Sequence, residues 1–158
     1  METFRHIGPG PHGDRSTVIF KGGRFEGPKL RGEILPGGGG VHLLMLDIRA
    51  DRTQVLTDWG IVRNHDGDQQ TAHLDTRYNL LTHDGATIYL QTIGTRTGKK
   101  EVLEKLSEGK IEADQFKMRL HLTMETGDDR YSWVNSGVFI ASAGRVGDMV
   151  VYDAYEVL

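Results

Sequence analysis

Hydrophobic and polar residues alternate along several stretches of the chain, a pattern typical of strands with one face in a core. Residues 115–125 (QFKMRLHLTME) alternate strictly, with Met118, Leu120, Leu122 and Met124 on one face and Lys117, Arg119 and His121 on the other. Residues 72–82 (AHLDTRYNLLT) also alternate. The sequence HDG at 83–85 is a hairpin-type turn signal, and residues 86–93 (ATIYLQTI) are the expected returning strand. These features predict antiparallel pairing of neighbouring strands.

Residues 126–141 (TGDDRYSWVNSGVFIA) begin with a turn signal and then alternate as well. As a strand, this stretch would place Tyr131, Trp133 and Asn135 on one face and β-branched aliphatic residues on the other. We therefore expect a strand that packs one face on the core and lines a cavity with the other.

Residues 99–109 are the one stretch with helical spacing, with a glycine at the expected stop. The other elements that the pattern predicts are a strand at 1–7, a loop at 8–13, a strand at 14–21, a bent edge strand at 25–35, a flexible loop at 36–40, a strand at 41–48 and a final run at 149–158. Short strands, frequent turns and a single helix predict an all-β fold. A single antiparallel β-barrel over residues 1–158 is the preferred arrangement, because closure removes exposed edges.

Composition excludes several classes of site. A chain of 158 residues suits one domain, and the absence of cysteine excludes disulfides and thiolate chemistry. A formal net charge of −3 disfavours nucleic-acid binding, because there is no basic excess to neutralise phosphates. No apolar run has membrane-spanning length and the N-terminus lacks a signal-peptide core, so we expect a cytoplasmic protein that does not bind membranes.

Three groups of residues are candidates for chemistry. Tyr131, Trp133 and Asn135 would stack on a flat ligand and fix its polar groups; alternatively, the aromatics fill the core and Asn135 ties down a loop. The second group is one face of the strand at 72–82, with His73, Asp75, Arg77 and Asn79. If this face pointed inward, it would supply a base and an oxyanion partner. Alternatively, it is the solvated face of its strand.

The third group is Asp58 beside Trp59, an acid held against an apolar wall or, alternatively, a turn residue and a core-capping indole. The seven histidines form neither HxH nor HExxH, so no metal is expected. No cofactor is expected either, because neither GxGxxG opening a helix nor a phosphate-binding GxxxxGK[ST] loop occurs.

Five motifs together resemble the domain-of-unknown-function 3237 family. They are GGRFEGPKLRGEILPGG (22–38), DW (58–59), LDTRYNLLTHDGATI (74–88), TGDDRYSWVN (126–135) and VVYDAYEV (150–157). The resemblance implies an antiparallel, lipocalin-like barrel, often assembled as a homo-oligomer, and members that resemble pathway accessories of small-molecule metabolism. It also favours a shared cavity, because its motifs contain the polar and aromatic candidates. In the family pattern LPGG runs almost directly into DW, so residues 41–57 are expected to be an inserted hairpin, lid or subunit contact.

The leading hypothesis is a cofactor-independent enzyme that performs acid–base chemistry, such as cyclisation, isomerisation, dehydration or epoxide opening, on a small oxygenated or aromatic metabolite. Asp58 or Asp75 would be the acid or base, and Arg77 and Asn135 would hold an oxygen that gains charge. Trp59, His73, Tyr131 and Trp133 would shape the binding cavity. A carrier or sensor barrel without turnover is the alternative, and a structural protein with a solid barrel is the third possibility.

Overall fold

The computed structural model describes residues 5–10, 13–19, 21–40, 45–46, 60–64, 68–105, 114–146 and 149–158. The strands are β1 (Arg5–Gly10), β2 (Gly13–Ile19), β3 (Gly23–Glu26), β4 (Arg31–Ile34), β5 (Gly39–Gly40), β6 (Met45–Leu46), β7 (Gly60–Asn64), β8 (Gln69–Thr82), β9 (Thr87–Lys99), β10 (Phe116–Glu125), β11 (Val138–Val146) and β12 (Met149–Val157). The helical segments in this part of the chain are α1 (Lys100–Glu104) and the 3-10 helix η2 (Asp129–Asn135).

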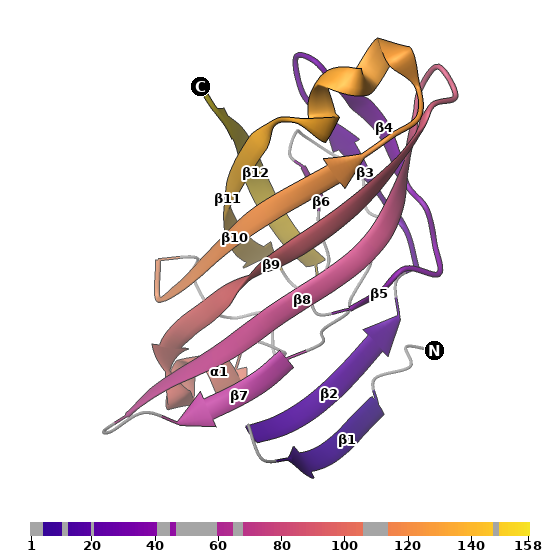
Figure 1. The fold of residues 1–158 in the computed structure, drawn as a ribbon. Coiled ribbons are helices and arrows are strands. Elements are labelled where there is room, and N and C mark those ends of the chain that lie inside the picture. Colours follow the sequence, from indigo (N-terminus) through magenta and orange to yellow (C-terminus); the bar gives the residue numbers. More distant parts are fainter. Residues whose placement is uncertain are drawn as a thin grey trace.

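The three longest strands, β8, β9 and β10, form the centre of a strongly curled sheet (Figure 1). Pairing runs in the order β1-β2-β5-β8-β9-β10-β11-β12-β6, and β4 joins β3 to β8. All of these pairs are antiparallel except that between β12 and β6, and β6 in turn lies beside β3. The predicted all-β antiparallel barrel with a short helix is therefore confirmed, and the helix is α1.

Alternate residues of the long strands point into the barrel and form one apolar core. Leu74 of β8, Gly94 of β9 and Leu120 of β10 lie side by side in one such inward row. A Cβ atom added at Gly94 would overlap the carbonyl oxygen of Arg119, so β9 and β10 approach each other there as only glycine permits. The close approach of these two strands thus depends on the missing side chain at this position.

Two hydroxyl pairs are buried within this core. The hydroxyls of Tyr78 and Tyr152 lie 3.0 Å apart and join β8 to β12 across the interior. Thr76 and Thr92 form a second pair at 2.6 Å between β8 and β9. Burial raises the pKa of both tyrosines above the ordinary value, so both phenols stay neutral at physiological pH. In both pairs each hydroxyl has the other as its hydrogen-bond partner, so neither group is buried unsatisfied, which would cost free energy.

The stretch 126–141 is not the single alternating strand that its pattern predicts. β10 ends at Glu125, η2 follows, and β11 begins at Val138. The reason is local capping: the Asp128 carboxylate accepts a hydrogen bond from the Arg130 backbone N–H at 3.0 Å and starts the helical turn. Tyr131, Trp133 and Asn135 therefore do not share a strand face.

Several smaller predictions are also corrected. The predicted loop at 8–13 is largely strand, because β1 continues to Gly10 and β2 begins at Gly13. The predicted bent strand at 25–35 is instead the hairpin of β3 and β4, and the predicted loop at 36–40 contributes β5. Of the segment 41–57, Met45–Leu46 forms strand β6 in the barrel wall and the rest lies outside the described residues. The HDG turn is confirmed between β8 and β9, with Gly85 at φ +90°.

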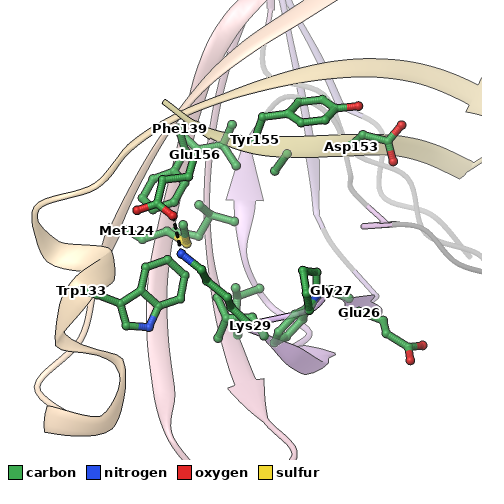
Figure 2. Close-up of a pocket in the computed structure, with 16 residues that line it drawn as sticks. Glu26, Gly27, Lys29, Met124, Trp133, Phe139, Asp153, Tyr155 and Glu156 are labelled. Carbon is green, nitrogen blue, oxygen red and sulfur yellow. Dashed lines mark hydrogen bonds and ion pairs between the residues drawn. The ribbon is translucent and has the colours of Figure 1, made fainter. Parts of the chain in front are cut away.

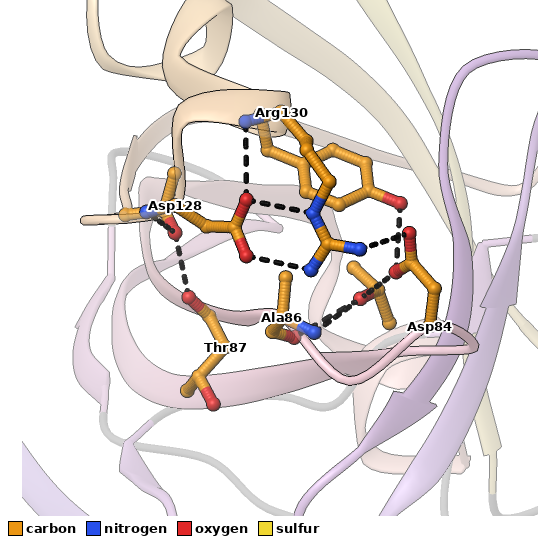
Figure 3. A network of polar contacts seen from close by, with 8 residues as sticks. Asp84, Ala86, Thr87, Asp128 and Arg130 are labelled. Carbon is orange, nitrogen blue, oxygen red and sulfur yellow. Dashed lines mark hydrogen bonds and ion pairs between the residues drawn. The ribbon is translucent and has the colours of Figure 1, made fainter.

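A network of charged and hydroxyl groups fastens η2 to the β8–β9 turn (Figure 3). The Arg130 guanidinium donates to both Asp128 oxygens, at 2.9 and 2.7 Å, and to Asp84 at 2.9 Å. The hydroxyls of Thr82 and Tyr131 donate to the other Asp84 oxygen, at 2.6 and 3.0 Å. Hydrogen bonds, from Thr82 above all, lower the pKa of Asp84, and those from Arg130 lower the pKa of Asp128.

Replacing Gly94 with alanine tests the close approach of β9 and β10. Gly94→Ala is expected to destabilise the protein by about 2 kcal/mol or more, because backbone must move to admit the methyl group. Gly127→Ala is the control, since a Cβ there meets no atom within 4 Å, and it should change the free energy of unfolding by less than about 0.5 kcal/mol. Urea unfolding measures both, and equal effects of the two substitutions would contradict the close approach.

The network on η2 predicts a pH dependence. Because the folded-state pKa values of Asp84 and Asp128 are lowered, their contribution to stability is present above the unfolded pKa of about 3.9 and is lost as pH falls through the folded values. Arg130→Gln should therefore lower Tm at pH 7 by more than at pH 3. Lys117→Gln, which removes an exposed positive charge from β10, is the control. A Tm difference between wild type and Arg130→Gln that stays constant from pH 7 to pH 3 would refute this role.

Candidate functional site

A pocket of about 430 Å³ opens at the end of the barrel beside η2 and the β3–β4 turn (Figure 2). Strands β3, β8, β9, β10, β11 and β12 supply its wall through residues near this end. The buried apolar side chains of the wall are Phe25, Leu80, Leu90, Leu122, Met124 and Phe139. Each of them is at most 8% exposed, so the body of the pocket is apolar.

The mouth of the pocket carries a charged pair beside an indole. The Lys29 Nζ atom lies 2.7 Å from Glu156 Oε2 and 4.9 Å from the centre of the Trp133 ring. Trp133 in turn meets Phe139 edge to face, with ring centres 6.0 Å apart and planes at 61°. Lys29 belongs to the β3–β4 turn, Trp133 to η2 and Glu156 to β12, so three separate elements meet at the mouth.

The buried tyrosine pair lies beneath the pocket. Leu80 and Ala154 line the pocket, and Tyr78 and Tyr152 are the next inward residues along the same two strands. Tyr152 also lines a second cleft of about 420 Å³, which opens where β10 and β11 run on beyond their last pair, Met118 with Ala143. Exposed side chains of both charge signs border that cleft, and it offers less apolar enclosure than the first pocket.

Among the residues proposed from one strand face, Trp133 alone lines the pocket, and it does so from η2. Tyr131 is buried and its hydroxyl donates to Asp84, so it anchors η2. The Asn135 amide accepts from the Thr126 N–H at 2.8 Å and donates to the Thr126 carbonyl at 3.0 Å. The alternative reading, in which Asn135 ties down a loop, describes its contacts.

The prediction that His73, Asp75 and Arg77 point into a cavity is wrong. They occupy the outward positions of β8, and the side chains of Arg77 and Asp75 are 54% and 46% exposed in their 3.1 Å ion pair. The strand buries the alternate set instead, because that set is apolar and includes Leu74, Tyr78 and Leu80. Asp58 and Trp59 lie outside the described residues.

Lys29 and Glu156 are the mouth residues that the sequence reading missed. The signal for Glu156 was the alternation of 150–157, which places it on the same face as Val150 and Tyr152. Lys29 follows Gly27-Pro28, a turn signal that separates two strands rather than bending one. A hairpin over 25–35 places Lys29 in a turn at the pocket mouth, and the alternation of 150–157 places Glu156 on the inward face of its strand.

Within the described ranges, His, Asp and Glu residues nowhere gather in groups of three or more that could hold a metal ion. No helix in the same part of the chain is long and apolar enough to cross a membrane.

Comparisons with known proteins identify relatives of similar size and fold. A β-barrel-like protein from Acinetobacter baumannii is 36% identical, with a TM-score of 0.70 over 97% of this chain and 85% of that chain. A conserved protein of unknown function from Rhodopseudomonas palustris is 28% identical, with a TM-score of 0.79 over 98% of this chain and 88% of that chain. A UPF0311 protein from Bradyrhizobium diazoefficiens is 29% identical over 92% of this chain and 82% of its own length.

The family described as "Protein of unknown function (DUF3237)" matches residues 1–157, nearly the whole chain. The motifs at 22–38, 74–88, 126–135 and 150–157 contribute the hairpin β3–β4, much of β8, η2 and β12, and each of these elements supplies residues to the pocket lining. The chain belongs to the DUF3237 family.

Proposed function

We propose that the protein binds a small, largely apolar molecule in the pocket beside η2. The observation that carries the proposal is the pocket itself, an apolar cavity of about 430 Å³ with a few polar groups gathered at its mouth. Sites for small molecules have this form: volumes of about 300–1,000 Å³, mostly apolar walls and a small number of orienting polar groups. A barrel filled solid by side chains would lack such a space, so the pocket favours a binding role over a purely structural one.

Binding without turnover is the first choice because of where two of the proposed catalytic residues, Asp75 and Arg77, lie. The Asp75 carboxylate and the Arg77 guanidinium are outside the barrel, where they cannot contact a molecule in the pocket. The buried wall residues Leu80, Leu90, Leu122 and Met124 carry no group that transfers protons. The pocket therefore offers an apolar wall to a bound molecule and polar contacts at its open mouth.

An acid–base enzyme is the second candidate, and Glu156 is the residue that favours it. Its carboxylate occupies an inward position of β12 at the mouth, 2.7 Å from the Lys29 ammonium. A carboxylate base with an adjacent cation could remove a proton beside a carbonyl group and hold the resulting negative charge. Cyclisation, isomerisation and dehydration all include such a step, which would now rest on Glu156 and Lys29 in place of Asp75 and Arg77.

Filling the pocket tests the binding proposal. N-phenyl-1-naphthylamine, a neutral fluorophore, should bind wild-type protein with a rise in fluorescence. Ala154→Phe adds a ring at a pocket-lining position and should weaken binding by about tenfold or more, equivalent to about 1.4 kcal/mol. Thr123→Phe makes the same kind of addition on the exposed face of β10 and should leave binding unchanged. If folded Ala154→Phe, checked by circular dichroism, bound the fluorophore as wild type does, the pocket would not be its site.

Hydrogen exchange separates the carrier from the enzyme. The methyl ketone 2-acetylnaphthalene is incubated with protein in D₂O, and proton NMR follows deuteration of its methyl group. An enzyme would accelerate exchange above the buffer rate, and Glu156→Gln would abolish the acceleration because it removes the base. A carrier would leave the exchange rate at the buffer value, an outcome that would eliminate Glu156 as a base towards this ketone.

A further inference from the structure

The ion pair at the pocket mouth combines one positive and one negative group against a single indole (Figure 2). The Glu156 side chain is 26% exposed and the Lys29 side chain 62%, so the carboxylate is the more enclosed partner. Within the described part of the chain, Lys29 is the cation that pairs with Glu156. The pair itself therefore presents a dipole with no net charge to a bound molecule. Glu26 and Asp153 also line the pocket, but both are exposed and their carboxylates point away from the pair in Figure 2.

We propose that the Lys29–Glu156 pair selects ligands by charge, so that the pocket takes a neutral molecule with a hydroxyl or carbonyl group at one end of an apolar body. This inference rests on the proposed binding function and adds the chemical class of the ligand. Lys29 and Glu156 are then specificity-determining residues.

An anionic ligand meets a penalty at this mouth. Its carboxylate or phosphate would be drawn to Lys29, but Lys29 already neutralises Glu156 at 2.7 Å. Moving Lys29 to the ligand would leave Glu156 partly enclosed and unpaired, with a second negative charge close by. Both the loss of the partner and the repulsion between like charges oppose binding, and the partial enclosure of Glu156 screens them less than full exposure to water would.

A cationic ligand meets the opposite penalty. An ammonium group could use both Glu156 and the face of Trp133, but Lys29 occupies that position, 4.9 Å from the ring centre. Lys29 is held nearby by the chain itself and therefore competes at a high effective concentration. The ligand would have to displace it and then tolerate a second positive charge at the mouth.

A neutral oxygen avoids both penalties. A hydroxyl can donate to Glu156 and accept from Lys29, and a carbonyl can accept from Lys29, while the ion pair stays intact. Hydrogen bonds to charged partners are stronger than those between neutral groups, so this end of the ligand is oriented as well as tolerated. The wall residues Phe25, Leu122 and Phe139 then enclose the apolar body.

A matched set of naphthalenes tests the charge selection at pH 7: 2-naphthol is neutral, 2-naphthoate is anionic and 2-(aminomethyl)naphthalene is cationic. Isothermal titration calorimetry measures the affinity of each for the full-length protein. Wild type is expected to bind 2-naphthol about tenfold more tightly than either charged compound. Naphthalene itself supplies the reference for the apolar body.

Two substitutions should shift the selection in opposite directions. Glu156→Gln leaves Lys29 without its carboxylate and should strengthen binding of 2-naphthoate by about tenfold, with no gain for the ammonium compound. Lys29→Met frees Glu156 and Trp133 and should strengthen binding of 2-(aminomethyl)naphthalene by a similar factor, with no gain for naphthoate. Unfolding cannot produce such reciprocal gains, so the pattern is diagnostic.

Lys99→Met and Asp68→Asn remove the partners of another exposed ion pair, at 3.6 Å and away from the pocket, and should leave all affinities unchanged. If 2-naphthol binds but 2-naphthoate binds wild type equally well, or the two variants fail to shift in opposite directions, the charge selection is wrong while the binding function stands. If neither naphthalene nor any of the three compounds binds, both proposals fall.

Discussion

The pleat of the central strands is the constraint on which the rest of the molecule depends. Because side chains alternate between the two faces of a strand, every inward residue of β8, β9 and β10 has outward neighbours, and the register carries the inward set across the sheet. The same rule places Leu80 in the pocket and Asp75 in solvent. The core, the pocket wall and the exposed charges are therefore all determined by which face of each strand points inward.

The sequence alone could predict this architecture because alternation is local and repeated. It predicted the strands around the HDG turn, the antiparallel pairing and the barrel. It did not settle which face of β8 turns inward, since a polar set beginning at His73 and an apolar set beginning at Leu74 each suit a cavity. That choice belongs to the whole sheet, which buries the more apolar set in common with its neighbours.

The error at 126–141 has a different physical origin. Alternation and helical capping compete in this segment, and the carboxylate of Asp128 satisfies a backbone N–H that a strand would need for its ladder. The Arg130 contacts, which reach Asp84 more than forty residues earlier, then hold the helical turn in place. Contacts between residues so far apart in the sequence produce no periodic pattern of hydrophobic and polar residues. The position of Trp133 could therefore not be predicted from the sequence.

The placement of η2 has a consequence for how this fold can vary. Trp133 reaches the pocket from a segment outside the strand ladders, and Lys29 reaches it from a turn. Substitutions at these positions need not disturb the register of a single strand pair. The strand ladders of the barrel can thus stay the same while the residues at the pocket mouth change, so relatives with the same wall can differ in the shape and charge of the mouth.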